Sequence, residues 1–257
     1  MEYVEMLRAR KVLRNYALVL LAGLILVVAS FFSNHVGAHL EVHVQTAKPG
    51  DPGAVGVFSS IFAACALAAF IIATCIAPGL NAESSTLALT WTRPVPRSTI
   101  AWRFIAIDLA TIAVSYAALF VVVIVVLAMF GVLGRFRFDG GDAAVVVARG
   151  LGCALMWYAL VTLVTARLPG RGGMIAGLSW AAFLVLAGLS ATPFPPLIGA
   201  LIALLNYLNP LAYFGHIGSG GQHAIIPLGG TLDTLLPWCI GIAALIGTVR
   251  LWSTREV

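Results

Sequence analysis

Long runs of apolar residues alternate with short polar segments along this chain and predict membrane-spanning helices. A helix needs about 17–25 mostly apolar residues to cross the hydrocarbon core of a bilayer. Six runs reach that length, and we predict spans at 16–33, 57–78, 102–132, 144–166, 173–192 and 235–252. The third run would extend about 45 Å as a helix, so we expect it to tilt or to project beyond the lipid.

A seventh apolar stretch, 194–214, differs from these six. Helix-breaking and polar residues interrupt it at Pro195, Pro196, Asn206, Asn209 and Pro210. Irregular backbone at membrane depth is tolerated only where protein or a water-filled cavity surrounds it. We therefore predict external interfacial or re-entrant helices here. The fold class is then an all-α polytopic membrane protein, with residues 1–257 forming a single transmembrane domain.

Composition excludes the main soluble classes. Of the 257 residues, 61% are hydrophobic and 10% are charged, whereas soluble domains carry about 25% charged residues. A cytosolic enzyme, a nucleic-acid-binding protein and a disordered protein are thereby excluded. The 15 Lys and Arg residues outnumber the 10 Asp and Glu residues, but they lie at the ends of the apolar runs. Such positions set topology and contact lipid headgroups, so the partner that they indicate is the bilayer.

The distribution of Lys and Arg predicts the orientation, because cytoplasmic loops carry an excess of these residues. With the N-terminus inside, the cytoplasmic side collects eleven of them: Arg8, Arg10, Lys11, Arg14, Arg93, Arg97, Arg103, Arg167, Arg171, Arg250 and Arg255. The other side holds Lys48, Arg135, Arg137 and Arg149. We expect the chain to be a multi-pass protein of the cell membrane, specifically a bacterial inner membrane. Both termini would then lie in the cytoplasm. Arg149, near the external end of the fourth span, is a candidate gate or intramembrane polar residue, and we favour a snorkelling anchor.

The external loop 34–56 carries three histidines at a spacing of four, His35, His39 and His43. On a helix their rings would share one face, as in a metal site. The apolar residues between them alternate with a period of two, which is typical of a strand. Residues four apart on a strand lie about 13 Å apart, too far to share one ion. We favour an external strand with a histidine face, suited to pH sensing or partner contact, over metal binding.

The connection between the second and third spans, residues 81–97, combines an amphipathic helix with a basic, proline-rich end. Glu83 lies in the first turn, where a carboxylate favours the helix dipole, and Leu87 and Trp91 share one face. Arg93-Pro94 and Pro96-Arg97 end the helix and place cations at the membrane surface. We predict a short cytoplasmic helix over 82–93. From the residues alone it is equally a docking element or an interfacial helix that only sets topology.

This connection resembles the coupling-helix region of the permease subunits of type 2 ABC exporters. The family pattern is matched by Glu83, Thr86, Leu87, Leu89, Arg93, Pro94, Val95 and Arg97. Ser85 stands where the family usually has Gly, and Pro96 stands where the family often has Ser. The resemblance extends to the basic segment Met1–Arg14, which is similar to an interfacial elbow helix, and to Asn206–Leu211, which is similar to the Asn-Pro motif before the last span.

The resemblance implies a permease that forms a translocation pathway as a dimer, with an identical or homologous second permease. A separate ABC ATPase subunit would bind ATP and Mg²⁺ and supply the energy. The residues implied to couple the two subunits are Glu83, Thr86, Leu87, Leu89, Trp91, Arg93 and Arg97. The chain itself has no Gly-rich phosphate loop ending in Gly-Lys-Ser/Thr, since its lysines are Lys11 and Lys48. We therefore expect no enzyme activity and no cofactor in this chain.

Polar residues within the spans are further candidates. Asp108 lies in the third span, where a carboxylate is costly and often functional. We consider a gate or coupling contact, for example with Arg103, and equally a carboxylate that snorkels or binds a neighbouring helix. For Trp157 and Tyr158 we favour packing over lining a pathway. The alternative functions are a secondary transporter or a regulatory or assembly membrane protein. A membrane-embedded enzyme is disfavoured because no Ser/His pairing or His-Glu-x-x-His helix is present.

Overall fold

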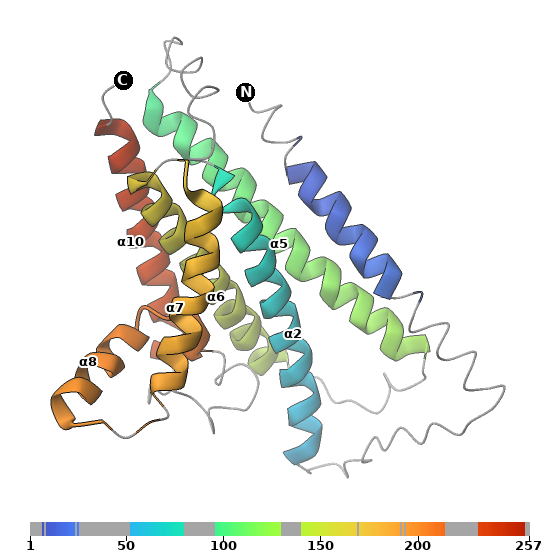
Figure 1. The fold of residues 1–257 in the computed structure, drawn as a ribbon. Coiled ribbons are helices and arrows are strands. Elements are labelled where there is room, and N and C mark those ends of the chain that lie inside the picture. The colour runs from blue at the N-terminus through green and yellow to red at the C-terminus, as the bar shows by residue number, and fades with distance from the viewer. Residues whose placement is uncertain are drawn as a thin grey trace.

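The computed structural model describes residues 7, 9–23, 25, 52–79, 96–129, 140–168, 170–190, 192, 194–213 and 231–254. The regular structure in these ranges is helical. A helix over 9–23 is followed by α2 (Pro52–Ile76), α5 (Arg97–Met129), α6 (Gly140–Arg167), α7 (Gly172–Leu189), α8 (Pro196–Asn206), the 3₁₀ helix η2 (Pro210–Tyr213) and α10 (Leu232–Thr254). Figure 1 shows the long helices side by side, with α8 projecting from one end of the bundle.

Four helices are long and apolar enough to cross a membrane: α5, Ala144–Arg167 within α6, α7 and α10. They coincide with the third to sixth predicted spans, so the sequence prediction is confirmed for these four. The predicted second span falls largely within α2, a helix of 25 residues. The predicted first span lies partly outside the described residues. The described part of the chain is thus all-helical, with the apolar helices of a membrane protein.

Two predicted boundaries are wrong. Residues 9–23 form one uninterrupted helix, so in the described part the basic segment and the first apolar run are not separated into an elbow and a span. No Gly or Pro lies between Arg10 and Ala22 to end the helix. Helix α2 begins at Pro52, within the predicted loop, because proline suits a first helical turn in which its missing N–H is not needed.

Helix α6 occupies the centre of the bundle. It packs against α2 and α10, and α5 crosses the bundle obliquely beside α2 (Figure 1). Met156, Trp157 and Tyr158 of α6 are completely buried. The helix over 9–23 lies along α5, where the Tyr16 hydroxyl donates a hydrogen bond of 3.0 Å to the carbonyl of Ser115. The interpretation of Trp157 and Tyr158 as packing residues is confirmed by their burial.

Glycines allow α6 and α10 to approach closely. A Cβ added at Gly152 would lie 2.6 Å from Nε1 of Trp238, and one at Gly241 would lie 3.2 Å from the Cα of Met156. The Trp238 indole is held in place because its Nε1 donates a hydrogen bond of 2.9 Å to the carbonyl of Ala148. Small residues at such contacts bring transmembrane helices together.

Gly152→Ala is therefore expected to destabilise the bundle, although alanine favours a helix over glycine by about 1 kcal/mol. Overpacking costs about 1–3 kcal/mol, which outweighs that gain. Gly177→Ala in α7 is the matched control, since a Cβ there meets nothing within 4 Å. Unfolding temperatures in detergent should fall for Gly152→Ala and not for Gly177→Ala. Equal temperatures for the two variants would contradict the close contact.

Helices α7 and α8 carry most of their surface outside the bundle. The buried residues of α7 are Gly172, Ile175 and Ala176, near its start. In α8 the exposed fraction reaches 82% at Leu197, and its sequence PLIGALIALLN has no charged residue. A helix that is apolar all round requires apolar surroundings. This surface therefore fits contact with lipid or with another apolar protein surface.

Candidate functional site

Most of the predicted ATPase-coupling residues lie outside the described residues. These are Glu83, Thr86, Leu87, Leu89, Trp91 and Arg93. Arg97 is the first residue of α5. The structure therefore shows the two helices that flank the predicted coupling segment, α2 and α5.

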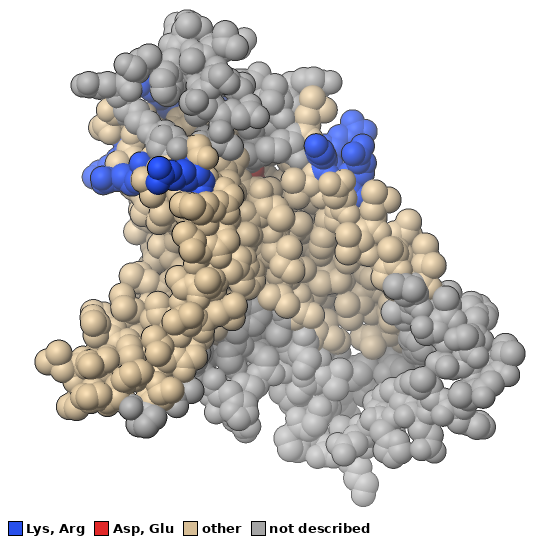
Figure 2. Space-filling model, viewed as in Figure 1, with Lys and Arg blue, Asp and Glu red and all other residues tan. Residues whose placement is uncertain are grey.

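The flanking helix ends lie at one end of the bundle, together with basic side chains. The end of α2, the start of α5, the end of α6, the start of α7 and the end of α10 all lie there (Figure 1). Figure 2 shows Lys and Arg gathered toward this end, which we call the basic end. Apart from Arg149, the described Lys and Arg residues belong to it: Arg10, Lys11, Arg14, Arg97, Arg103, Arg167, Arg171 and Arg250.

At the basic end, the residues that follow α2 contact both α6 and α7. Pro78 follows α2 and packs on the start of α7, because a Cβ added at Gly172 would lie 2.6 Å from the Cβ of Pro78. The Thr162 hydroxyl of α6 lies 3.4 Å from the carbonyl of Ala77 and donates a hydrogen bond of 2.6 Å to the carbonyl of Tyr158. The residues that follow α2 thus contact both α6 and α7.

Asp108 is held inside the bundle by a neighbouring helix. The residue is 1% exposed, and the Tyr158 hydroxyl of α6 donates a hydrogen bond of 2.8 Å to its Oδ2. Hydrogen bonds to a carboxylate are shorter and stronger than neutral ones. Of the readings considered for Asp108, the structure shows binding to a neighbouring helix and not snorkelling. Sequence analysis missed Tyr158 as its partner, because the two residues are far apart in the chain.

Tyr158→Phe is expected to destabilise the protein by about 1.5–3 kcal/mol, the range for a hydrogen bond to a charged group. The matched control is Tyr207→Phe, because Tyr207 lies in the short turn after α8 and contributes its backbone carbonyl to the bond from Tyr213. Denaturant unfolding in detergent measures both variants. Stability of Tyr158→Phe equal to that of the wild type would show that the bond to Asp108 contributes little.

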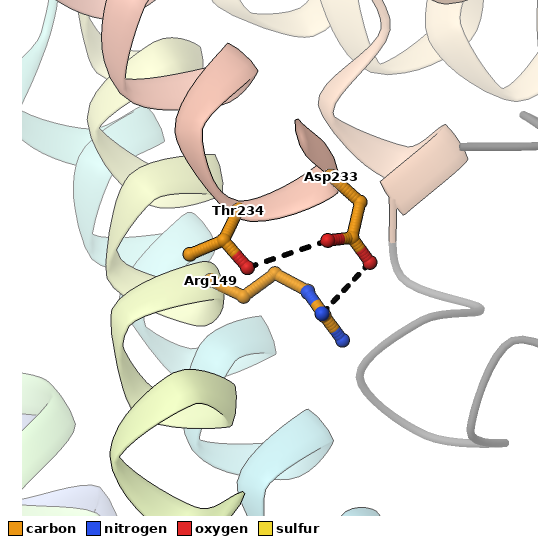
Figure 3. A network of polar contacts seen from close by, with 3 residues as sticks. All are labelled: Arg149, Asp233 and Thr234. Carbon is orange, nitrogen blue, oxygen red and sulfur yellow. Dashed lines mark hydrogen bonds and ion pairs between the residues drawn. The ribbon is translucent and has the colours of Figure 1, made fainter. Parts of the chain in front are cut away.

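Arg149 and Asp233 form an ion pair between α6 and the first turn of α10 (Figure 3). Nη2 of Arg149 lies 2.7 Å from Oδ2 of Asp233, and the side chains are only 11% and 4% exposed. The Thr234 hydroxyl lies 3.4 Å from Oδ1 of Asp233. The prediction that Arg149 snorkels to the surface is wrong, because a carboxylate inside the bundle neutralises it.

Asp233 was not singled out from the sequence, although a signal was present. It is the one charged residue between Arg171 and Arg250. A charge that is isolated in a long apolar region requires a partner. Arg149 lies at the end of a span on the predicted external side, where the topology predicts few basic residues. Together these two anomalies indicated the pair.

The stretch after α7 forms short helices, and asparagines fasten them to α7. Asn209 Nδ2 donates hydrogen bonds of 3.0 Å to the carbonyl of Phe183 and to Oδ1 of Asn206. Asn206 Nδ2 lies 3.5 Å from the carbonyl of Leu186. Phe183 lies six residues before the end of α7, about 9 Å along the helix axis. The chain thus returns alongside α7, and the buried asparagine amides bind carbonyls of α7.

Tyr213 ends this segment inside the bundle. Its side chain is completely buried, and its hydroxyl donates a hydrogen bond of 3.0 Å to the carbonyl of Tyr207. Burial raises the pKa of the Tyr213 phenol above its ordinary value, so the phenol stays protonated and remains a donor. This hydrogen bond joins the end of η2 to the residue that follows α8 and stabilises the turn between them.

Four aromatic rings meet where α2, α6 and α7 come together, and we call them the aromatic cluster: Phe70, Trp157, Trp180 and Phe183. The Trp157 ring centroid lies 4.5 Å from that of Trp180, 4.9 Å from that of Phe183 and 5.2 Å from that of Phe70. Nε1 of Trp180 donates a hydrogen bond of 3.0 Å to the Thr74 hydroxyl. The cluster joins α7 to the rest of the bundle.

The described residues contain no group of three or more His, Cys, Asp or Glu side chains that could hold a metal ion. His35, His39 and His43, the weak candidates from the sequence, lie outside the described residues. The predicted histidine strand therefore remains a prediction.

Comparisons of the chain with protein-family models, with curated proteins and with solved structures found no match. The resemblance to type 2 ABC exporter permeases consequently depends on the motif over 83–97 and on the arrangement of the spans.

Proposed function

We propose that this chain is the transmembrane permease subunit of an ATP-driven ABC exporter. It would form the translocation pathway with a second permease copy, identical or homologous, and couple to a separate ATPase subunit. The observation that supports this most strongly is the attachment of α2 at the basic end. The segment with the coupling-helix pattern follows Pro78, which packs on Gly172 at the start of α7.

In this proposal the basic end faces the cytoplasm. Cytoplasmic surfaces of membrane proteins are rich in Lys and Arg, and the described basic residues other than Arg149 lie at that end. An ATPase subunit would then bind residues 83–93 on the same side as the ends of α6 and α10. ATP and Mg²⁺ would be held by that partner.

The proposed mechanism is alternating access. Closure of the ATPase pair moves the coupling helices, and the contacts of Pro78 with Gly172 and of Ala77 with Thr162 pass this motion to α7 and α6. The second and fifth predicted spans, in α2 and α7, then change the opening between the two permeases. Helix α8 and η2 would cap the external exit as re-entrant helices.

The proposed cargo is hydrophobic, amphiphilic or lipid-linked. The faces of α7 and α8 carry apolar side chains, including Leu178, Leu184, Leu197 and Leu204. Such surfaces do not replace the hydration shell of an inorganic ion, which requires carbonyl or charged ligands. An apolar pathway therefore favours cargo that partitions into lipid.

A second candidate is a secondary transporter, and Asp108 is the observation that favours it. Ionisable residues at membrane depth mark proton or ion pathways in pumps and transporters, and Asp108 is buried between α5 and α6. Secondary transporters are built from internal repeats, and the sequence shows no repeated halves. We therefore prefer the exporter.

Purification of the tagged chain from its native membrane in mild detergent tests the proposal. An exporter permease brings an ATPase with it, and the preparation hydrolyses ATP. The expected result is one co-purifying protein with a Gly-rich phosphate loop. A pure preparation without ATPase activity, stable in detergent, would contradict the exporter and leave the Asp108 transporter as the better account.

A further inference from the structure

The aromatic cluster contains a hydrogen-bond donor that the fold does not use. Trp157 is completely buried, and its Nε1 has no hydrogen-bond partner among the described residues. The indoles of Trp180 and Trp238 both donate, to the Thr74 hydroxyl and to the carbonyl of Ala148. A buried donor without an acceptor costs free energy, and such a group in a folded protein requires an explanation.

The rings around this donor form an apolar, aromatic enclosure. Phe70 meets Trp157 edge-on at 87°, and Phe183 meets it at 65°. These geometries place ring edges against ring faces, the arrangement that aromatic groups prefer. An aromatic ligand in place of one ring would make the same contacts. None of the four residues is charged, so the enclosure favours a neutral molecule.

Two of the four rings lie at the edge of the core. Trp180 and Phe183 are partly buried and pack against the core from outside it, whereas Phe70 and Trp157 belong to it. Both rings at the edge come from α7, which is buried only near its start, at Gly172, Ile175 and Ala176. A molecule arriving from the lipid would therefore meet Trp180 and Phe183 before it meets Trp157.

The cluster also lies at a suitable depth. Trp157 is near the middle of the span Ala144–Arg167, and Trp180 is near the middle of Gly172–Leu189. We propose that the aromatic cluster is a binding site for a neutral aromatic molecule with one hydrogen-bond acceptor. The acceptor receives the Trp157 N–H, and a ring of the ligand replaces Trp180 or Phe183. That this ligand is cargo rests on the proposed exporter function; the binding itself does not.

Benzophenone tests this site directly, because it is aromatic, has a single ketone acceptor and crosslinks to nearby side chains under light. The purified chain is labelled in detergent, without nucleotide, and the labelled peptides are mapped by mass spectrometry. We expect saturable labelling of peptides that contain Phe70, Trp180 or Phe183. Fluorenone should compete about fivefold better than fluorene, which lacks the acceptor, as expected for one hydrogen bond.

Trp157→Phe keeps an aromatic ring and removes the donor, so half-saturation should need about five times more benzophenone. Trp238→Phe, which removes an indole between α6 and α10, should label like the wild type. Unfolding temperatures of both variants show that they are folded. Labelling outside the cluster, equal competition by fluorenone and fluorene, or unchanged labelling of folded Trp157→Phe would each overturn the proposal. ATPase co-purification is scored separately, so failure of the exporter and failure of this site are distinguishable.

Discussion

Replacing Arg149 by Met should destabilise the protein by about 3–5 kcal/mol, the cost of leaving one partner of a buried ion pair uncompensated. Asp233 is 4% exposed in the bundle, and its Oδ2 lies 2.7 Å from Arg149. Asp233→Leu should cost a similar amount, because it leaves the guanidinium buried instead. Denaturant unfolding in detergent, followed by circular dichroism, measures the loss.

Two double variants distinguish the contribution of the ion pair to stability from the contribution of side-chain packing. Arg149→Met with Asp233→Leu removes both charges and should recover most of the stability, since apolar replacement of a buried pair is often neutral or stabilising. Arg149→Asp with Asp233→Arg restores opposite charges and should recover part of it. Arg250→Met is the control for loss of an exposed arginine. Double variants no more stable than the single ones would contradict the pairing.

Glu83→Ala and Arg93→Ala should leave membrane insertion intact and weaken coupling to the ATPase. The resemblance places both residues in the coupling motif, whereas neither lies within a predicted span. Coupling free energies of about 1–3 kcal/mol correspond to changes of about 5–150-fold, so the ATPase activity that co-purifies with the chain should fall by a factor in this range. Membrane fractionation and ATPase assays measure the two effects.

Glu41→Ala and Arg255→Ala are the matched controls, because they remove one acidic and one basic residue outside the motif. Both should retain ATPase activity. Failure of Glu83→Ala and Arg93→Ala to reach the membrane would instead show that the segment only sets topology. Normal insertion with unchanged ATPase activity would contradict any role in coupling.

The sequence predicted the long helices well, because hydrocarbon requires internal hydrogen bonding of every backbone group and therefore long apolar helices. The third to sixth predicted spans all correspond to helices of sufficient length. The breaks at Asn206, Asn209 and Pro210 likewise marked the end of α8 and the start of η2. Local chemistry determines such features, so a single sequence contains them.

Contacts between helices were harder to predict, because they depend on residues far apart in the chain. Arg149 was assigned to the surface since its partner Asp233 lies 84 positions later. Tyr158 was assigned to packing alone, although it also binds Asp108. The asparagines were recognised as helix breakers, but not as the groups that fasten the turn to Phe183. Hydropathy gives no information about which helix faces which.

The most direct test of the exporter is a crosslink from Ala88→Cys, in the middle of the predicted coupling helix, to the co-purifying ATPase. A short thiol-directed crosslinker is applied to native membranes, and Ala38→Cys on the predicted external loop is the control. The proposal predicts a crosslinked permease–ATPase product at position 88 and none at position 38. An ATPase that co-purifies but crosslinks at neither position, or absence of any ATPase, would contradict the assignment of residues 83–93 as the coupling helix.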